Sequence, residues 1–147
     1  MCRSLSVAYV VRPLLPSEAC VAARAWNDLA DGTLDPATVQ RVEQLLSEAG
    51  TTRFAAFTAD KDGELCGLAT ARVVSHPVNG TYGEIDALMI DARLPDEAGA
   101  ELASAAIDWL RDRGVSRIVH LRNPGAPPVF WERIGFRPEK LRYALDV

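Results

Sequence analysis

Hydrophobic positions recur along the chain with two different periods, which separate the predicted helices from the predicted strands. Apolar residues spaced three or four positions apart predict helices over residues 16–30, 36–49 and 95–113. Asp35 suits the N-cap of the second helix because Pro36 fits the first helical position. A shorter helix fits residues 127–134. The helical segments are therefore distributed along the whole chain.

Short apolar or alternating runs predict the strands, with turns between them. They lie at residues 7–11, 54–59, 64–74, 84–90 and 117–121, with a last strand or hairpin between 136 and 145. Asp62-Gly63 marks a hairpin turn, because this pair adopts positive φ at low cost. The helix over 95–113 joins two strands, and such a connection makes a right-handed unit with parallel strands. The pattern predicts an α/β fold with a mixed sheet.

Length and charge narrow the class of protein. The chain of 147 residues fits one domain spanning 1–147, and its net charge is −4 with basic residues scattered along it. Nucleic-acid binding needs clustered Lys and Arg, so no nucleic acid is expected as a partner. No run of about 18 apolar residues suggests a membrane span, and the N-terminus lacks a signal-peptide pattern, so a cytoplasmic protein is expected. The two histidines lie far apart and form no metal motif, so no metal is expected.

The junction ARLPDEAGAELASA, residues 92–105, carries the first candidate chemistry. A strand-to-helix junction often binds phosphate, because the first helical turn has free N–H groups and a positive dipole end. This one places Asp96 and Glu97 in that turn and has a single glycine, Gly99. Carboxylates stabilise a helix start but repel phosphate. The junction therefore allows two interpretations, a phosphate cradle and a self-capped helix start.

Five short motifs, in order, give the chain a family resemblance. They are Val11-Arg12-Pro13, DGELCG from Asp62, EIDALMID from Glu84, AAIDWLRDRG from Ala105, and Asn123 followed by FWERIGF. Together they resemble the GNAT superfamily of acyl-CoA-dependent N-acetyltransferases over essentially the whole chain. The resemblance implies a mostly antiparallel sheet of about 6–7 strands with flanking helices, in which a central parallel pair of strands splays apart.

In that family acetyl-CoA is the donor substrate, and its pantetheine arm lies in the slot between the splayed strands. The resemblance implies that backbone groups of Leu88, Met89 and Ile90 pair with pantetheine and that the pyrophosphate lies at the start of the helix over 95–113. The other cofactor positions that it implies are Pro95, Glu97, Ala98, Gly99, Ala100, Asn123, Pro128 and Trp131. The family pattern at the phosphate loop, [QR]-x-x-G-x-[GA], is altered here, with Leu94 and Glu97 at its first and fourth positions.

The resemblance also indicates where the chemistry would occur. Glu84 matches a position where several members place a catalytic Glu, although a solvated residue at a strand edge is an equal interpretation. Trp131 falls where the family often has a Tyr as general acid, and Trp has no usable acid, so packing against the slot is expected of it. His120 lies in a predicted buried strand and is expected to be a core histidine with satisfied hydrogen bonds.

Two functions follow from these motifs. The first is an N-acetyltransferase that moves an acetyl group from acetyl-CoA to a small-molecule or peptide amine. The alternative is a catalytically impaired GNAT-fold protein that acts as a binding or regulatory module, which rests on the changes at Leu94, Glu97 and Trp131. Dimers are common in the family, so the resemblance also allows a homodimer.

Overall fold

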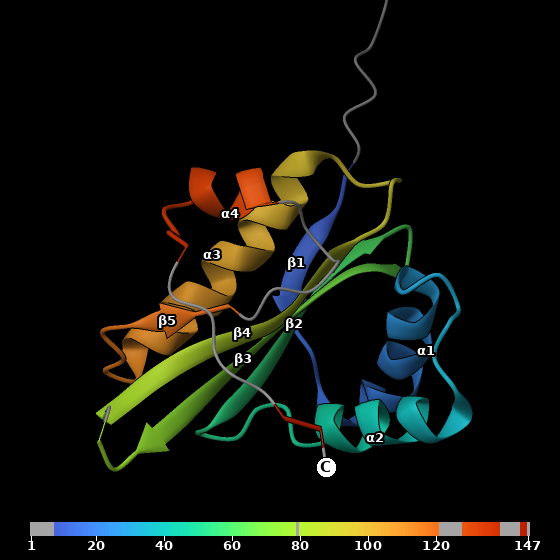
Figure 1. Ribbon diagram of the computed structural model, residues 1–147. Coiled ribbons are helices and arrows are strands. Elements are labelled where there is room, and N and C mark those ends of the chain that lie inside the picture. Colours follow the sequence, from blue (N-terminus) through green and yellow to red (C-terminus); the bar gives the residue numbers. More distant parts are fainter. Residues whose placement is uncertain (1–7, 79, 121–127, 139–144, 147) are drawn as a thin grey trace, which may run out of the picture.

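One twisted sheet of five strands organises the part of the chain that the computed structural model describes, which is residues 8–78, 80–120, 128–138 and 145–146 (Figure 1). The strands, in sheet order, are β1 (Val10–Pro13), β2 (Phe54–Lys61), β3 (Glu64–His76), β4 (Gly80–Ile90) and β5 (Ile118–Val119). All neighbours are antiparallel except β4 and β5, which are parallel. The mixed, mostly antiparallel sheet is confirmed, with fewer strands than expected. Most of the expected last strand falls on residues 139–144, outside the described residues.

The helices lie on both faces of this sheet. They are α1 (Ala19–Leu29), preceded by a single 3-10 turn at Pro16–Glu18, α2 (Pro36–Leu46), α3 (Asp96–Asp112) and α4 (Pro128–Arg133). The predicted N-cap of α2 is confirmed, because Asp35 Oδ1 accepts a 2.7 Å hydrogen bond from the Thr38 N–H. In the residues with a described structure, no helix is long and apolar enough to span a membrane.

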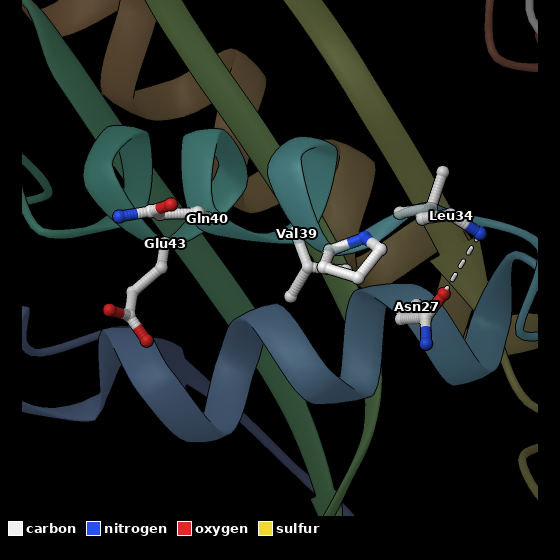
Figure 2. A pocket seen from close by; sticks show the side chains of 6 residues that line it. Asn27, Leu34, Val39, Gln40 and Glu43 are labelled. Atoms are coloured by element: carbon white, nitrogen blue, oxygen red, sulfur yellow. Dashed lines mark hydrogen bonds between the residues drawn. The ribbon is translucent and has the colours of Figure 1, made fainter.

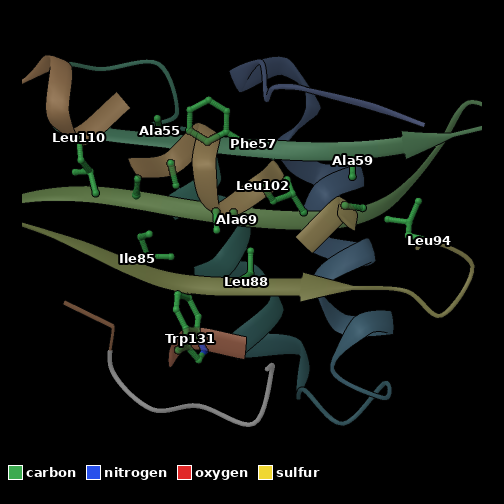
Figure 3. Packing of buried hydrophobic residues seen from close by; sticks show 14 of the residues in the cluster. Ala55, Phe57, Ala59, Ala69, Ile85, Leu88, Leu94, Leu102, Leu110 and Trp131 are labelled. Atoms are coloured by element: carbon green, nitrogen blue, oxygen red, sulfur yellow. The ribbon is translucent and has the colours of Figure 1, made fainter. Parts of the chain in front are cut away.

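Two hydrophobic cores fill the spaces between the sheet and its helices, and the alternation of strand side chains assigns residues to them. On β2, Ala55 and Phe57 point to the core shared with α3, whereas Phe54 and Ala56 point to the core shared with α1 and α2. Figure 3 shows the first core, with Leu102 and other α3 side chains facing the sheet. The sheet is thus the middle of three layers.

The parallel pair β4–β5 separates soon after it forms. Its register contains two pairs, Gly83 with Ile118 and Glu84 with Val119. Just beyond, β4 has a bulge, since two of its residues, Asp86 and Ala87, lie opposite Thr70 of β3. The Thr70 hydroxyl accepts a 3.1 Å hydrogen bond from the Ala87 N–H. The described strands therefore leave one side of residues 86–90 unpaired, which we call the open edge of β4.

Several strand boundaries differ from the sequence expectation, and two of these differences bear on the site. β4 begins at Gly80 rather than at residue 84, because it continues the long hairpin ladder with β3 up to the pair His76–Gly80. β5 ends at Val119, so the expectation that His120 lies within a strand is wrong. Both differences arise from strand pairing, which a single-strand pattern does not contain.

Candidate active site

The open edge of β4 presents backbone groups of alternate residues. The Asp91 N–H donates to the Cys66 carbonyl across the β3 ladder at 2.7 Å. Backbone groups alternate in direction along a strand, so Met89 also faces β3, and Leu88 and Ile90 direct their N–H and C=O groups to the open edge. The resemblance implies three residues that pair with pantetheine. The register leaves the backbone groups of Leu88 and Ile90 available for such pairing, whereas those of Met89 face β3.

Helix α3 begins beside this edge without a side-chain cap. Its N-cap residue is Pro95, which provides no capping side chain, and Asp96 and Glu97 of the first turn are exposed. Among the described residues, Pro95 makes no side-chain cap hydrogen bond, in contrast to Asp35 at α2. Asp96 and Glu97 lie in the first turn, where carboxylates stabilise a helix start through its dipole, so both interpretations of this junction stay open. The Ala98 N–H donates to the Pro95 carbonyl at 3.0 Å, so within the described residues the N–H groups of Asp96 and Glu97 are left for solvent or an anion, although two carboxylates lie next to them.

The loop before α3 is anchored by one ion-pair cluster and one buried side chain. Arg93 pairs with Asp91 at 3.1 Å and with Glu64 at 2.7 Å. Leu94, at a position where the family pattern has Arg or Gln, is 5% exposed and belongs to the core under α3. The ion pairs of Arg93 and the buried side chain of Leu94 thus fix the approach of β4 to α3.

Two small residues let α3 lie close to its neighbours. Ala98 and Gly99 are buried in the first turns of the helix, and Ala100 is partly buried. A Cβ at Gly99 would lie 3.4 Å from Phe130 Cε1 and 3.6 Å from Ile90 Cδ1. The start of α3, the end of β4 and α4 therefore meet at this point.

A charged cluster lies on the sheet face opposite α3, where Glu84 meets Arg72 and Asp86. Arg72 Nη2 lies 2.6 Å from Glu84 Oε2 and 3.4 Å from Asp86 Oδ2. The Glu84 side chain is 12% exposed, so the alternative of a solvated residue at a strand edge is wrong. It lies within β4 because the strand starts four residues earlier than expected. One arginine thus bridges two carboxylates at the bulge.

The pKa of the Asp86 carboxyl is shifted, and its neighbours Glu84 and Arg72 contribute to the shift. Burial raises the pKa of the Asp86 carboxyl above its ordinary value, the nearby Glu84 adds to the rise, and Arg72 opposes it. The hydrogen bond from Arg72 to Glu84 in turn raises the pKa of the guanidinium. A carboxyl whose pKa is shifted by burial and a like charge is typical of acid–base sites. The sequence analysis missed Asp86, although its i, i+2 spacing from Glu84 places both on one face of a strand.

His120 and Trp131 meet where β4 and β5 separate. Their rings stack with centroids 3.7 Å apart and an interplanar angle of 20°. His120 Nδ1 lies 2.8 Å from the Ile85 carbonyl, while His120 Nε2 and Trp131 Nε1 are buried with no hydrogen-bond partner among the described residues. The expectation of a satisfied core histidine is therefore wrong. Burial lowers the pKa of His120, partly offset by the Ile85 carbonyl.

Trp131 itself is 7% exposed and packs against the β4 edge between Ile85 and Leu88 (Figure 3). It contacts Phe130 and Phe136 edge-on, with ring centroids 5.5 and 5.1 Å apart. Trp131 is thus a packed side chain, and its place at the donor slot stays a prediction. Two other expected cofactor positions give no test, because Asn123 and the Pro128 side chain lie outside the described residues.

Two hollows lie on the helical side that carries α1 and α2. The larger, of about 490 Å³, is bordered by both helices and lined by Asn27, Leu34, Pro36, Val39, Gln40 and Glu43 (Figure 2). The Leu34 N–H donates to Asn27 Oδ1 at 3.1 Å and fixes the loop between the helices. The smaller, of about 320 Å³, includes Arg72, Phe54 and Val73 in its lining. Arg72 thus connects the smaller hollow to Glu84 and Asp86.

In the described part of the chain, no three His, Cys, Asp or Glu side chains gather as metal ligands.

Comparison with solved structures identifies the fold. The aminoglycoside N-acetyltransferase AAC(6')-Iy in complex with CoA superposes with a TM-score of 0.77 at 17% identity, over 99% of each chain. A predicted acetyltransferase from Clostridium acetobutylicum with acetyl-CoA gives 0.78 at 11% identity, over 95% of this chain and 96% of that one. Ribosomal-protein-alanine N-acetyltransferase from Brucella melitensis biovar Abortus 2308 gives 0.72 at 20% identity, over 95% and 100%.

The sequence itself assigns the family. Residues 22–136 match the Acetyltransferase (GNAT) family, so the chain belongs to this family, as the resemblance implied. Acetyl-CoA is the donor substrate of the family, and CoA or acetyl-CoA is present in two of the similar structures. A search of curated protein sequences gives no significant match.

Proposed function

We propose that this protein is an N-acetyltransferase that moves the acetyl group of acetyl-CoA to an amine. One arrangement carries the proposal: the open edge of β4 runs from the bulge at Asp86 to the uncapped start of α3. An extended arm with amide groups fits such an edge, because free backbone donors and acceptors pair with it as a further strand would. An anionic end then meets the free N–H groups of a helix start.

In this arrangement the pantetheine amides pair with Leu88 and Ile90, and Met89 supports the strand from the β3 side. The pyrophosphate lies at the first turn of α3, at Pro95, Glu97, Ala98, Gly99 and Ala100. Trp131 borders the arm from α4, and Asn123 and Pro128 complete the proposed cofactor positions.

Glu84 and Asp86, on the face of the sheet opposite α3, are the carboxylates proposed to remove the amine proton. An amine arrives mostly as an ammonium ion, so a base must take one proton before nitrogen can attack the thioester carbon. Glu84 is the proposed base, because it lies just before the β4 bulge where the open edge begins and because Arg72 holds its side chain at 2.6 Å. Asp86, next to it, receives or relays the proton. The carbon–nitrogen bond then forms, the carbon–sulfur bond breaks, and the sulfur takes up a proton.

The acceptor is proposed at the level of chemical class, a small-molecule or peptide amine. The names of similar structures include an aminoglycoside, a ribosomal-protein alanine and glucosamine-6-phosphate as amine-bearing substrates. The carboxylates of Glu84 and Asp86 suit a positively charged amine, and Arg72, which pairs with both, links them to the hollow of about 320 Å³. No observation on the described residues favours the impaired module.

Binding of the donor tests the proposal directly. Acetyl-CoA at about 100 times its Kd should raise the unfolding free energy by roughly 2.7 kcal/mol, measured by thermal shift and calorimetry. Acetyl-pantetheine, which lacks the pyrophosphate, is the matched ligand, and it should bind more weakly if the start of α3 holds phosphate. Absence of any acetyl-CoA binding at millimolar concentration would refute the proposal.

A further inference from the structure

His120 makes a hydrogen bond that fixes its tautomer. Gly83 donates its N–H to the carbonyl of Arg117, the residue before β5, at 2.9 Å, so Gly83 and, two residues on, Ile85 direct their backbone groups toward β5. The Ile85 carbonyl is taken by the His120 ring instead, with Nδ1 at 2.8 Å. A carbonyl oxygen can only accept, so Nδ1 carries the proton. In the neutral ring, Nε2 is therefore the basic nitrogen.

This basic nitrogen is buried and has no partner in the described structure. The same holds for the indole N–H of Trp131, which stacks on the imidazole at 3.7 Å. Buried polar groups left without hydrogen bonds cost free energy and are uncommon in folded proteins. Two of them side by side, where the strands separate, indicate a place that a polar ligand group completes.

The position of the pair along β4 indicates which ligand group arrives there. On the proposed function, the donor runs from the start of α3 past Ile90 and Leu88 toward the bulge, and its reactive sulfur ends that path. His120 is bonded to Ile85, one residue before the bulge, and Trp131 packs between Ile85 and Leu88. The pair thus lies at the sulfur end of the path, and Trp131 occupies the position where the family often has a tyrosine acid.

We propose that His120 carries the proton from the attacking nitrogen to the departing sulfur, replacing the acid that Trp131 cannot supply. After the first amine proton has gone to Glu84 and the carbon–nitrogen bond has formed, nitrogen still holds an excess proton. Nε2 accepts it, the carbon–sulfur bond breaks with its electron pair on sulfur, and Nε2–H returns the proton to the thiolate. The ring ends as it began, and the products are the amide and the thiol of CoA.

The surroundings of the ring favour this cycle. It requires a neutral imidazole at rest, and burial keeps the pKa of His120 below its ordinary value. Glu84 and Asp86 of β4 and Glu132 and Arg133 of α4 are charged groups on the packed elements, and none of them contributes to that shift. Trp131 holds the ring plane by stacking while the Ile85 carbonyl holds the Nδ1 proton.

Nitrogen-15 NMR of the two histidines tests the proposal with a matched pair of ligands, CoA and desulfo-CoA. The change His120→Asn assigns the resonances, because it removes Nε2 while its amide nitrogen, as many bonds from Cα as Nδ1, can still donate to Ile85. His76 supplies the internal control. We expect an unprotonated Nε2 in the free protein and a shift of its resonance with CoA that desulfo-CoA does not produce.

The outcomes separate this inference from the proposed function. If both ligands bind and the Nε2 resonance responds to them equally or not at all, His120 does not meet the sulfur and the proposal is overturned, while the acetyltransferase assignment stands. If neither ligand binds, the proposed function fails and the inference fails with it. A protonated Nε2 in the free protein at pH 7 would also overturn it. Retained desulfo-CoA affinity in His120→Asn shows that the variant is folded and that its site is intact.

Discussion

Arg72 and Glu84 face each other across the β3–β4 ladder, with Nη2 2.6 Å from Oε2, next to the point where β4 bulges. The sequence allowed Glu84 to be a solvated residue at a strand edge, but in the structure its carboxylate is held by Arg72 within β4. The neighbouring Asp86 shares the same guanidinium at 3.4 Å. Orientation by a charged partner and proximity to a second carboxyl are the features that suit Glu84 to proton transfer.

Substitution of Glu84 by Gln should separate turnover from binding. The amide keeps the shape and the contact with Arg72 but cannot take a proton, so turnover should fall by about 10²–10⁴-fold, the usual contribution of a general base. Affinity for acetyl-CoA should not change. Thiol release under saturating donor measures the first, and calorimetry the second. Glu64→Gln, which removes the charge from an exposed pair with Arg93, is the control and should leave turnover intact. Unchanged turnover in Glu84→Gln would remove Glu84 from its role.

Substitution of Asp86 by Asn should change how stability depends on pH. The folded-state pKa of Asp86 is raised, mainly by burial, so the folded protein binds this proton more readily than the unfolded chain. Its contribution to stability is therefore full below the unfolded pKa of ~3.9 and is lost as pH rises through the higher folded pKa. Asp86→Asn lacks that loss and should be more stable than the parent protein at pH 7, with the difference shrinking toward pH 4. Urea unfolding across this range measures it, and a constant difference at all pH values would contradict the raised pKa.

Neutralising the first turn of α3 should exchange stability for affinity. Asp96 and Glu97 interact favourably with the helix dipole, so Asp96→Asn with Glu97→Gln should cost roughly 0.3–1 kcal/mol per charge. The same changes remove repulsion toward a pyrophosphate and should tighten CoA binding. Both effects should shrink at high salt, because exposed charges are screened. Thermal unfolding and calorimetry measure them, and Glu48→Gln at an exposed position beyond α2 is the control. Weaker CoA binding in the double variant would mean that the phosphate lies elsewhere.

Substitution by alanine should change stability differently at two glycines, Gly83 beside α3 and Gly99 within it. A Cβ at Gly83 would lie 2.8 Å from both Cδ atoms of Leu110, a fully buried side chain, so Gly83→Ala should destabilise the fold by about 1–3 kcal/mol. At Gly99 the nearest atom is Phe130 Cε1 at 3.4 Å, an ordinary contact, and alanine favours the helix by up to ~1 kcal/mol. Gly99→Ala should therefore be neutral or stabilising. Chemical denaturation of both variants tests the pair, and similar losses would contradict the close packing at Leu110.

Local sequence patterns predicted most of the elements for physical reasons that act over a few residues. The Asp35 cap and Pro36 define the start of α2, and the Asp62-Gly63 turn has the positive φ values expected, 53° and 78°. The boundaries of β4 and β5 were less accurate, since the β3 ladder extends one and the splay shortens the other. Strand ends depend on partners that are distant in sequence.

In the candidate site, too, some residues could be predicted from local sequence, whereas others depend on contacts between distant segments. Motif order alone predicted a donor slot at residues 88–90, 95 and 97–100 and pointed to Glu84 and Trp131, because these positions belong to contiguous stretches. Arg72, Asp86 and His120 became candidates only through contacts between strands: the β3–β4 register brings Arg72 to the carboxylates, and the end of the β4–β5 ladder gives the Ile85 carbonyl to His120.

The sequence by itself determined the family, the order of the elements and the unusual charges at the start of α3, all of which are written in local composition and spacing. Tertiary structure decided that Pro95 at the start of α3 makes no side-chain cap hydrogen bond, that Leu94 is core, and that a bulge opposite Thr70 leaves Leu88 and Ile90 facing an open edge. It also left His120 Nε2 and Trp131 Nε1 without hydrogen-bond partners in the part of the chain that the structure describes. The physical reason is that hydrogen-bond satisfaction and burial are properties of neighbours in space, which strand register and helix packing assign.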